Sequence, residues 1–582
     1  MNTLVIVLIA AVVLVCAYAG YGRWLAKTWG VDPNAKTPAV RLEDGKDYVP
    51  TNGWTVFAHQ FSSIAGAGPV TGAIQAAAFG WLPVLLWVLI GGVFFGAVTD
   101  FGALYASVKN DGKSMGLLIE KYIGKTGRKL FLLFCWLFCG IVIAAFADMV
   151  AGTFNAFDAE GAQVEAAFTN GAAGMVSIMF MVFAVVFGFI QKKFNFSGWR
   201  EAVIGIVFIV LSFAVGMNCP LVFGKAAWSY ITFVYIFFAA VLPMWMLKQP
   251  RDYMTTFMFG AMIAGAVIGL LVAHPTMNLP VFTGFNNAKL GTMFPILFVT
   301  VACGAVSGFH SLVSSGTSSK TVENEKDMLK VGYGAMVLES LLAVLALCVA
   351  GAAAAADGTP ATGTPFQIFS RGVAGFFEMF GVPVSIATVF MTMCVSALAL
   401  TSLDAVARIG RMSFQELFSV DDMEHAEGWR KLCCNVYFST FITLVFGFIL
   451  TQIGYANIWP LFGSANQLLS ALVLATLCVF LKVTGRNNKM LFPPLVIMLC
   501  VTFTALVQRL IAMVKAISAA ASTAIPAGET TWGAVFIANG LQLILAVLLI
   551  VLGLNIVFHS VKSYTTCDAP EAKDHCLSVI GT

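Results

Sequence analysis

Five ionisable side chains lie within long apolar stretches of the chain, where they could carry protons. They are Asp100, Glu339, Asp404, His59 and His310. Each acidic group in a bilayer costs about 2.5–3.5 kcal/mol on insertion scales, so it needs either a partner or a function. Histidine titrates in the physiological range and can take up or release a proton there. The alternative is structural: such a side chain can hold neighbouring helices together by a hydrogen bond, and Asp404 can pair with Arg408 one turn later.

Two apolar stretches are interrupted near their middles by Gly, Ser and Pro. The interruptions contain Ser62, Ser63, Gly66, Gly68 and Pro69 in the first stretch, and Ser307, Gly308 and His310 in the second. Helix-breaking residues free backbone groups that lipid cannot satisfy, so broken helices point to a binding site or a water-filled cavity. The alternative is that Gly and Ser only permit close helix packing.

Metal and enzyme signatures are weak. Cys135 and Cys139 share a helix face, but no His or further Cys completes a set of metal ligands, so packing is the favoured interpretation. Residues 112–114 resemble the end of a phosphate-binding loop, yet Ser107 replaces the upstream glycine and no nucleotide-binding domain follows. No HExxH pair or GxSxG elbow occurs in a suitable setting. The sequence therefore predicts no enzyme, no ATP-driven pump and no cofactor beyond a coupling cation.

The elements that carry these residues are membrane-spanning helices. The chain is 59% hydrophobic and only 11% charged, which does not suit a water-soluble surface. Blocks of about twenty apolar residues are long enough to cross a bilayer. The sequence thus predicts an all-α polytopic membrane protein of about fifteen spans. They are 2–22, 54–78, 83–106, 130–153, 172–191, 201–219, 228–247, 254–273, 292–318, 331–356, 380–404, 433–453, 456–481, 491–515 and 532–558.

The distribution of Lys and Arg predicts the orientation, because short cytoplasmic loops are enriched in them. With the N-terminus outside and the C-terminus inside, all but five of the 33 basic residues lie in inner segments. The exceptions are Lys225, Lys289, Arg371, Arg509 and Lys515. Residues 362–379 are less regular, and we expect an outer re-entrant or interfacial piece there.

This orientation makes the two interrupted spans, 54–78 and 292–318, antiparallel. Each begins a run of five spans, which is the pattern of an inverted five-helix repeat with discontinuous helices that meet near the midplane. The predicted organisation is a leading helix (1–28), a first repeat (53–219), two inserted helices (228–273), a second repeat (291–485), two C-terminal helices (490–558) and a cytoplasmic tail (559–582).

Seven motifs in order along the chain resemble the carbon starvation protein A family. They are YVPTN (48–52), IAGAGP (64–69), GAVTDF (96–101), ACGAVSGFH (302–310), GYGAM (332–336), TSLD (401–404) and WPLFGSANQL (459–468). The resemblance implies an uptake carrier of the bacterial cytoplasmic membrane within the amino acid–polyamine–cation superfamily, with a LeuT-like fold. Members of the family are linked to peptide import and to proton-coupled pyruvate import under nutrient limitation. Longer members look to carry a His pair where this chain has His59-Gln60.

The same resemblance implies roles for the candidate residues. In the superfamily, the helices that correspond to 54–78, 292–318 and 380–404 surround the substrate and a coupling ion. The implied substrate contacts are Ser62, Ser63, Gly66, Gly68, Ser307, Gly308 and His310. Thr401 and Ser402 correspond to the place where related carriers hold sodium, and Asp404 beside them is a candidate proton acceptor. With His59, Asp100 and Glu339, these three make up the predicted set for ion or proton coupling.

The predicted function is alternating-access symport of a small carboxylate such as pyruvate, or of a short peptide, with protons slightly favoured over sodium as the coupling ion. The expected partners are a small-molecule substrate and the lipid bilayer, and not nucleic acid. A channel and a membrane nutrient sensor are the alternatives.

Overall fold

A computed structural model describes residues 2–44, 48–158, 160–194, 198–243, 246–287, 290–420, 427–522 and 532–566. Within these ranges the regular structure is helical apart from one hairpin of β1 (Asn286–Asn287) and β2 (Gly291–Thr292). Most residues of the predicted tail 559–582 lie outside the described residues, and α23 ends at Thr566.

Twelve helical segments among the described residues are long and apolar enough to cross a membrane. They are α1–η1–α2 (Thr3–Thr28), α6–η3–α7 (Trp81–Val108), α9 (Lys125–Phe154), α10 (Ala167–Phe194), α11 (Trp199–Asn218), α13 (Lys248–Ala273), α14–η4–α15–η5 (Met293–Lys320), η6–η7–α16 (Glu325–Ala353), α18 (Val384–Phe418), α21 (Tyr455–Val483), η8–α22 (Lys489–Ala519) and α23 (Phe536–Thr566). The bent pair of α19 (Gly428–Cys434) and α20 (Val436–Thr451) makes a thirteenth if it is one span.

The remaining two predicted spans are shorter or broken. Span 228–247 coincides with the 17-residue α12 (Lys225–Val241), and span 54–78 is divided into α4 (Gly53–Ile64) and α5 (Gly68–Ala76). All fifteen predicted spans therefore overlap helix. Short helices α3 (Pro38–Arg41) and α8 (Met115–Tyr122) lie in the connections. The prediction of an all-α polytopic membrane protein is confirmed.

Both predicted interruptions are breaks in the structure. The first separates α4 from α5, and the second separates α14 (Met293–Val301) from α15 (Gly308–Gly316) through the 3-10 turn η4 (Ala302–Gly304). Pro69 at the start of α5 has no N–H to donate, so the helix starts there without losing a hydrogen bond. The prediction of two discontinuous helices is confirmed.

The two broken helices cross in antiparallel order. Early in the first, the Gln60 side chain donates to Ser314 Oγ of the second at 2.8 Å. Near the breaks, a Cβ on Gly68 would lie 2.7 Å from Cys303 Sγ. Later still, a Cβ on Gly72 would lie 2.5 Å from the carbonyl oxygen of Val301. The residue numbers rise along one helix as they fall along the other. The assignment of each helix to a five-helix repeat stays a prediction.

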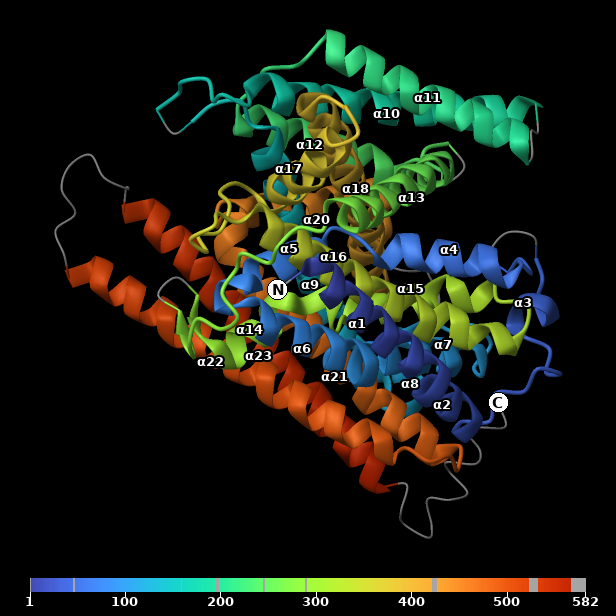
Figure 1. The fold of residues 1–582 in the computed structure, drawn as a ribbon. Coiled ribbons are helices and arrows are strands. Elements are labelled where there is room, and N and C mark those ends of the chain that lie inside the picture. The colour runs from blue at the N-terminus through green and yellow to red at the C-terminus, as the bar shows by residue number, and fades with distance from the viewer. Residues whose placement is uncertain are drawn as a thin grey trace.

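The most buried helices of the bundle are α9, the broken α14–α15, α16, α18 and α21, while two helix pairs lie at its edges. All of the most apolar 18-residue window of α21 is buried, against less than half of that window in α11, α22 and α23. Figure 1 shows α22 and α23 packed together along one edge and α10 with α11 along the opposite edge. The broken helices thus lie among neighbours that exclude lipid from their freed backbone groups.

Most of residues 362–379 form a regular helix, α17 (Pro365–Glu378). Thr364 and Gln367 make a reciprocal capping box at its start, and Pro365 occupies the first turn. Its apolar face packs on α16 (Ala335–Ala353) and α18. Residues of α17 and of the end of α16 together bound a cavity.

A side chain at Gly463 would collide with the main chain of a broken helix. A Cβ there would lie 1.9 Å from the carbonyl oxygen of Val299 in α14. We expect Gly463→Ala to lower the free energy of unfolding by about 1–3 kcal/mol, because overpacking forces the two helices apart. Gly260→Ala is the control, since no atom lies within 4 Å of the position that its Cβ would take on α13. Thermal unfolding of the purified variants tests this, and equal midpoints would contradict it.

Candidate functional site

A buried histidine lies between two carboxylates contributed by different helices. His310 Nδ1 is 3.0 Å from Asp100 Oδ2, and His310 Nε2 is 3.3 Å from Glu339 Oε2. All three residues have 0% exposure. We call these three residues the Asp–His–Glu cluster. The sequence singled out each of them separately, and the structure brings them together.

One helix start and two π-helical turns position the cluster. His310 lies in the first turn of α15, directly after the second break. Asp100 lies in the first turn of α7 (Ala97–Val108), which follows the π-helix η3 (Gly92–Gly96). Glu339 lies near the start of α16, which follows the π-helix η7 (Leu329–Gly334). Each half of the chain thus supplies one carboxylate that follows a π-helical turn within a longer helical span, and such turns are frequent at functional sites.

Glycines let these helices approach closely enough for the cluster to form. A Cβ on Gly332 would lie 2.7 Å from the Cα of Phe101, the residue after Asp100. A Cβ on Gly96 would lie 2.4 Å from the carbonyl oxygen of Ala305 in the second break. The main chains are therefore in direct contact on two sides of the cluster, so its distances are set by packing.

The cluster has the chemistry of a proton site. Within the described residues, Asp100 Oδ1 and both Glu339 oxygens have no hydrogen-bond partner. With an imidazolium between two carboxylates the net charge is −1, and it becomes zero when one carboxyl is protonated. A buried charge without a counter-charge is energetically costly. Uptake or loss of one proton therefore changes both the net charge of the cluster and its energy.

Asn466 of α21 holds the start of α15 in place. Its Oδ1 accepts hydrogen bonds from the backbone N–H of Phe309 and from Ser307 Oγ, each at 3.1 Å. Its Nδ2 donates to Cys303 Sγ at 3.3 Å. A side chain from another helix therefore satisfies backbone and side-chain groups at the break. The sequence patterns did not single out Asn466, although it lies in one of the family motifs.

The first break lies against α18. A Cβ on Gly66 would lie 2.2 Å from Ser402 Oγ, so a larger residue there would force the Ser402 hydroxyl to move. The hydroxyls of Thr401 and Ser402 donate to carbonyls of their own helix, at 2.9 Å to Ala397 and 3.2 Å to Leu398. The structure therefore brings together Gly66 and Ser402, two residues predicted to belong to the substrate and ion sites.

Two other predicted substrate contacts are packed against neighbouring helices. A Cβ on Gly308 would lie 2.5 Å from the backbone nitrogen of Ser470, and one on Gly68 would meet Cys303 Sγ. Both positions thus fit the alternative of close helix packing. Ser62 Oγ donates to the carbonyl of His59 at 3.1 Å, and Ser63 is half-buried. Among the described residues no hydrogen bond or ion pair joins His59 to the Asp–His–Glu cluster.

Asp404 is paired with Arg251, not with Arg408. Arg251 of α13 makes an ion pair with Asp404 Oδ2, and both side chains are 1% exposed. Tyr235 of α12 donates to the same oxygen at 2.9 Å. Arg408 instead donates to main-chain carbonyls at the end of α12, including that of Leu242 at 2.9 Å. The structural alternative for Asp404 therefore holds with a different partner, because an arginine on another helix takes the place of Arg408.

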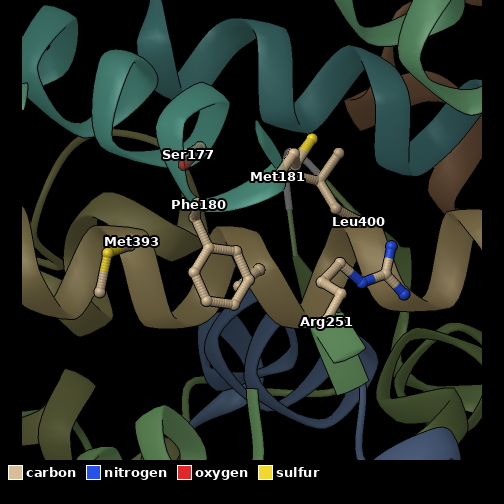
Figure 2. A pocket seen from close by; sticks show the side chains of 7 residues that line it. Ser177, Phe180, Met181, Arg251, Met393 and Leu400 are labelled. Atoms are coloured by element: carbon tan, nitrogen blue, oxygen red, sulfur yellow. The ribbon is translucent and has the colours of Figure 1, made fainter. Parts of the chain in front are cut away.

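The sequence also assigned Arg251 to an inner loop, whereas it lies within α13 and is buried. Figure 2 shows it beside Phe180 of α10 and Leu400 of α18, where these residues line a narrow crevice. Its other amino group is 2.8 Å from Asp252. In the sequence, the one sign of this burial is that Arg251 lies only three residues before the predicted span 254–273.

Removing one partner of this pair tests its burial. We expect Arg251→Ala to lower the free energy of unfolding by about 3–5 kcal/mol, because Asp404 is left buried without a counter-charge. Arg41→Ala is the control: its ion pair with Asp111 is half exposed, and we expect a loss below about 1 kcal/mol. Denaturant unfolding in detergent measures both, and equal losses would contradict the buried pair.

Known proteins resemble this chain along most of its length. The family model for carbon starvation protein CstA matches residues 2–362 and 351–505. The peptide transporter CstA of Escherichia coli K12 is 31% identical over 87% of this chain and 80% of that protein. The pyruvate/proton symporter BtsT of the same organism is 36% identical over 60% of this chain and 49% of that protein. A solved manganese transporter from Eremococcus coleocola is 12% identical, with a TM-score of 0.45 over 90% of this chain and 99% of that chain. By its family model and its relatives, this chain belongs to the carbon starvation protein CstA family.

Proposed function

We propose that this protein is a secondary active transporter that imports a small carboxylate such as pyruvate, or short peptides, by proton symport with alternating access. The family supports transport, since relatives carry the names peptide transporter and pyruvate/proton symporter. The observation that carries proton coupling is His310 held between Asp100 and Glu339 with no exposure to solvent.

In this proposal the Asp–His–Glu cluster binds the coupling proton. His310 belongs to α15, the same helix that begins at the second break. A change in the charge of the cluster therefore acts on the helix whose start is held by Asn466 beside that break. Such a link between protonation and the broken helix is what coupled transport requires, because proton and substrate must bias the same conformational change.

The substrate is proposed to bind at the two breaks, near Ser62, Ser63, Gly66 and Ser307. The carboxylate of pyruvate or of a peptide suits backbone N–H groups freed at a break. Thr401 and Ser402 make sodium the alternative coupling ion, because hydroxyl and carbonyl oxygens suit a hard cation. Asp404 is a weaker candidate for proton transfer, since Arg251 already compensates its charge.

We place the protein in a bacterial cytoplasmic membrane with its N-terminus outside and its C-terminus inside, from the distribution of Lys and Arg. A channel and a nutrient sensor are the alternatives to a carrier, and no enzymatic activity is proposed. A channel predicts conduction far above carrier turnover without stoichiometric coupling. A sensor predicts no net uptake.

Purified protein in liposomes tests the transport proposal. We expect uptake of labelled pyruvate or of a labelled dipeptide against its gradient when the outside is acidic, and collapse of that uptake by a protonophore. A sodium gradient at equal pH on both sides is the comparison, and uptake driven only by sodium would shift the coupling role to Thr401 and Ser402. No gradient-dependent uptake of either solute would contradict the symporter.

Glu339→Gln tests the role of the cluster. The amide keeps the shape of the side chain but cannot take up a proton, so we expect proton-driven accumulation to fall about 100-fold or more, as for the loss of one proton-transfer group. Exchange of labelled for unlabelled solute without a gradient should fall much less. The control is Asp357→Asn, which removes an exposed acid from a loop. Equal accumulation by Glu339→Gln and the unchanged protein would remove Glu339 from the coupling site.

A further inference from the structure

A cavity of about 550 Å³ lies where α17 meets the end of α16 and the loop that follows it. This volume is within the usual range of pockets for small ligands. Its walls are mostly apolar and small, among them Ala352, Ala353 and Ile368. Arg371 is the one charged side chain that lines it. The proposed proton and substrate sites make no use of this cavity.

The Arg371 guanidinium is held in place by main-chain carbonyls. Its Nε donates to the carbonyl of Gln367 at 3.2 Å, and Nη2 donates to the carbonyl of Thr362 at 2.5 Å. Gly363 has a φ of +124°, and a Cβ there would lie 2.5 Å from Nη2. The loop therefore needs glycine in order to fold around the guanidinium.

Arg371 is exposed, and among the described residues these main-chain contacts leave its charge without a carboxylate partner. Within the described residues no carboxylate forms an ion pair with it, and Nη1 has no hydrogen-bond partner. The face to which Arg371 belongs is the one that the Lys and Arg distribution predicts to be outer. Two other basic residues on that face are engaged: Lys225 pairs with Asp148 at 2.8 Å, and Arg509 donates to Gln542 at 2.6 Å.

We propose that this cavity is a docking site for the carboxylate of a small organic acid, which Arg371 binds before the acid reaches the transport site. The proposal deepens the proposed function and rests on it for the direction of transport. A fixed guanidinium with one free amino group favours a single carboxylate, and among the described residues no second cation lines the cavity to suit a more highly charged anion. The small apolar walls suit the short hydrocarbon part of such an acid.

Docking is tested by labelling inside the cavity, because this readout does not require transport. Ala361 also lines the cavity, and Ala361→Cys gives a thiol for a membrane-impermeant maleimide, with the unsubstituted chain as the background. We expect pyruvate to slow the labelling, and its uncharged amide, pyruvamide, to leave the rate unchanged. Adding Arg371→Gln should abolish the protection by pyruvate. The proposal is overturned if pyruvate still slows labelling when Arg371→Gln is added. It is also overturned if pyruvate does not slow the labelling of Ala361→Cys alone.

Uptake kinetics give a second, independent measurement. We expect Arg371→Gln to raise the KM for pyruvate about tenfold, the loss of one charge-assisted contact, with kcat little changed. Arg371→Lys keeps the positive charge but loses the planar guanidinium with its paired N–H donors. Its KM for pyruvate should lie between those of the unchanged protein and Arg371→Gln. Lys515→Gln removes an exposed charge from α22 on the same predicted face, and should leave KM unchanged. A fall in kcat with unchanged KM would show that Arg371 only supports the loop, and would overturn docking.

The labelling and uptake measurements separate the two proposals. If the unchanged protein shows no gradient-driven uptake, the proposed transport function fails, and the labelling of Ala361→Cys still decides whether the cavity binds a carboxylate. If uptake is normal but pyruvate protects equally with and without Arg371, the docking site fails and the transport function stands.

Discussion

Backbone groups freed by a broken helix have to be satisfied inside the protein, because lipid offers them no hydrogen bonds. Here the two breaks lie against each other and against α18 and α21, so protein surrounds both of them. Asn466 accepts the N–H of Phe309 at the start of α15, and Gly66 lets the first break approach Ser402. The glycines at the crossing are needed because main chain meets main chain or a short side chain there.

The same crossing determines where charge can be buried. His310 follows the second break by one turn, which directs it toward Asp100 and Glu339 on two other helices. Each carboxylate follows a π-helical turn and one comes from each half of the molecule. In the proposed function, a proton bound at this junction acts on the broken helix through direct packing, without a separate relay.

The partners of the buried charged residues could not be predicted from their neighbours in the sequence. Each member of the Asp–His–Glu cluster was recognisable as a costly group in an apolar stretch, but hydropathy carries no information on which helices meet. Arg408 was the natural partner for Asp404 by spacing along one helix, yet Arg251 from a distant helix takes that place. Asn466 gave no local signal, because an amide in an apolar helix does not reveal which N–H it accepts.

The sequence by itself determined the helical class, the fifteen segments, the two interruptions and the family, since hydrophobic length, helix breakers and short motifs are local properties of the chain. Only the tertiary structure decided that His310 lies between two carboxylates, that Gly68 and Gly308 lie directly against neighbouring helices, and that Arg251 is buried. The physical reason is that a buried polar group is stabilised by whichever partner packing brings within hydrogen-bond distance. That partner is set by how helices cross and not by its distance along the chain.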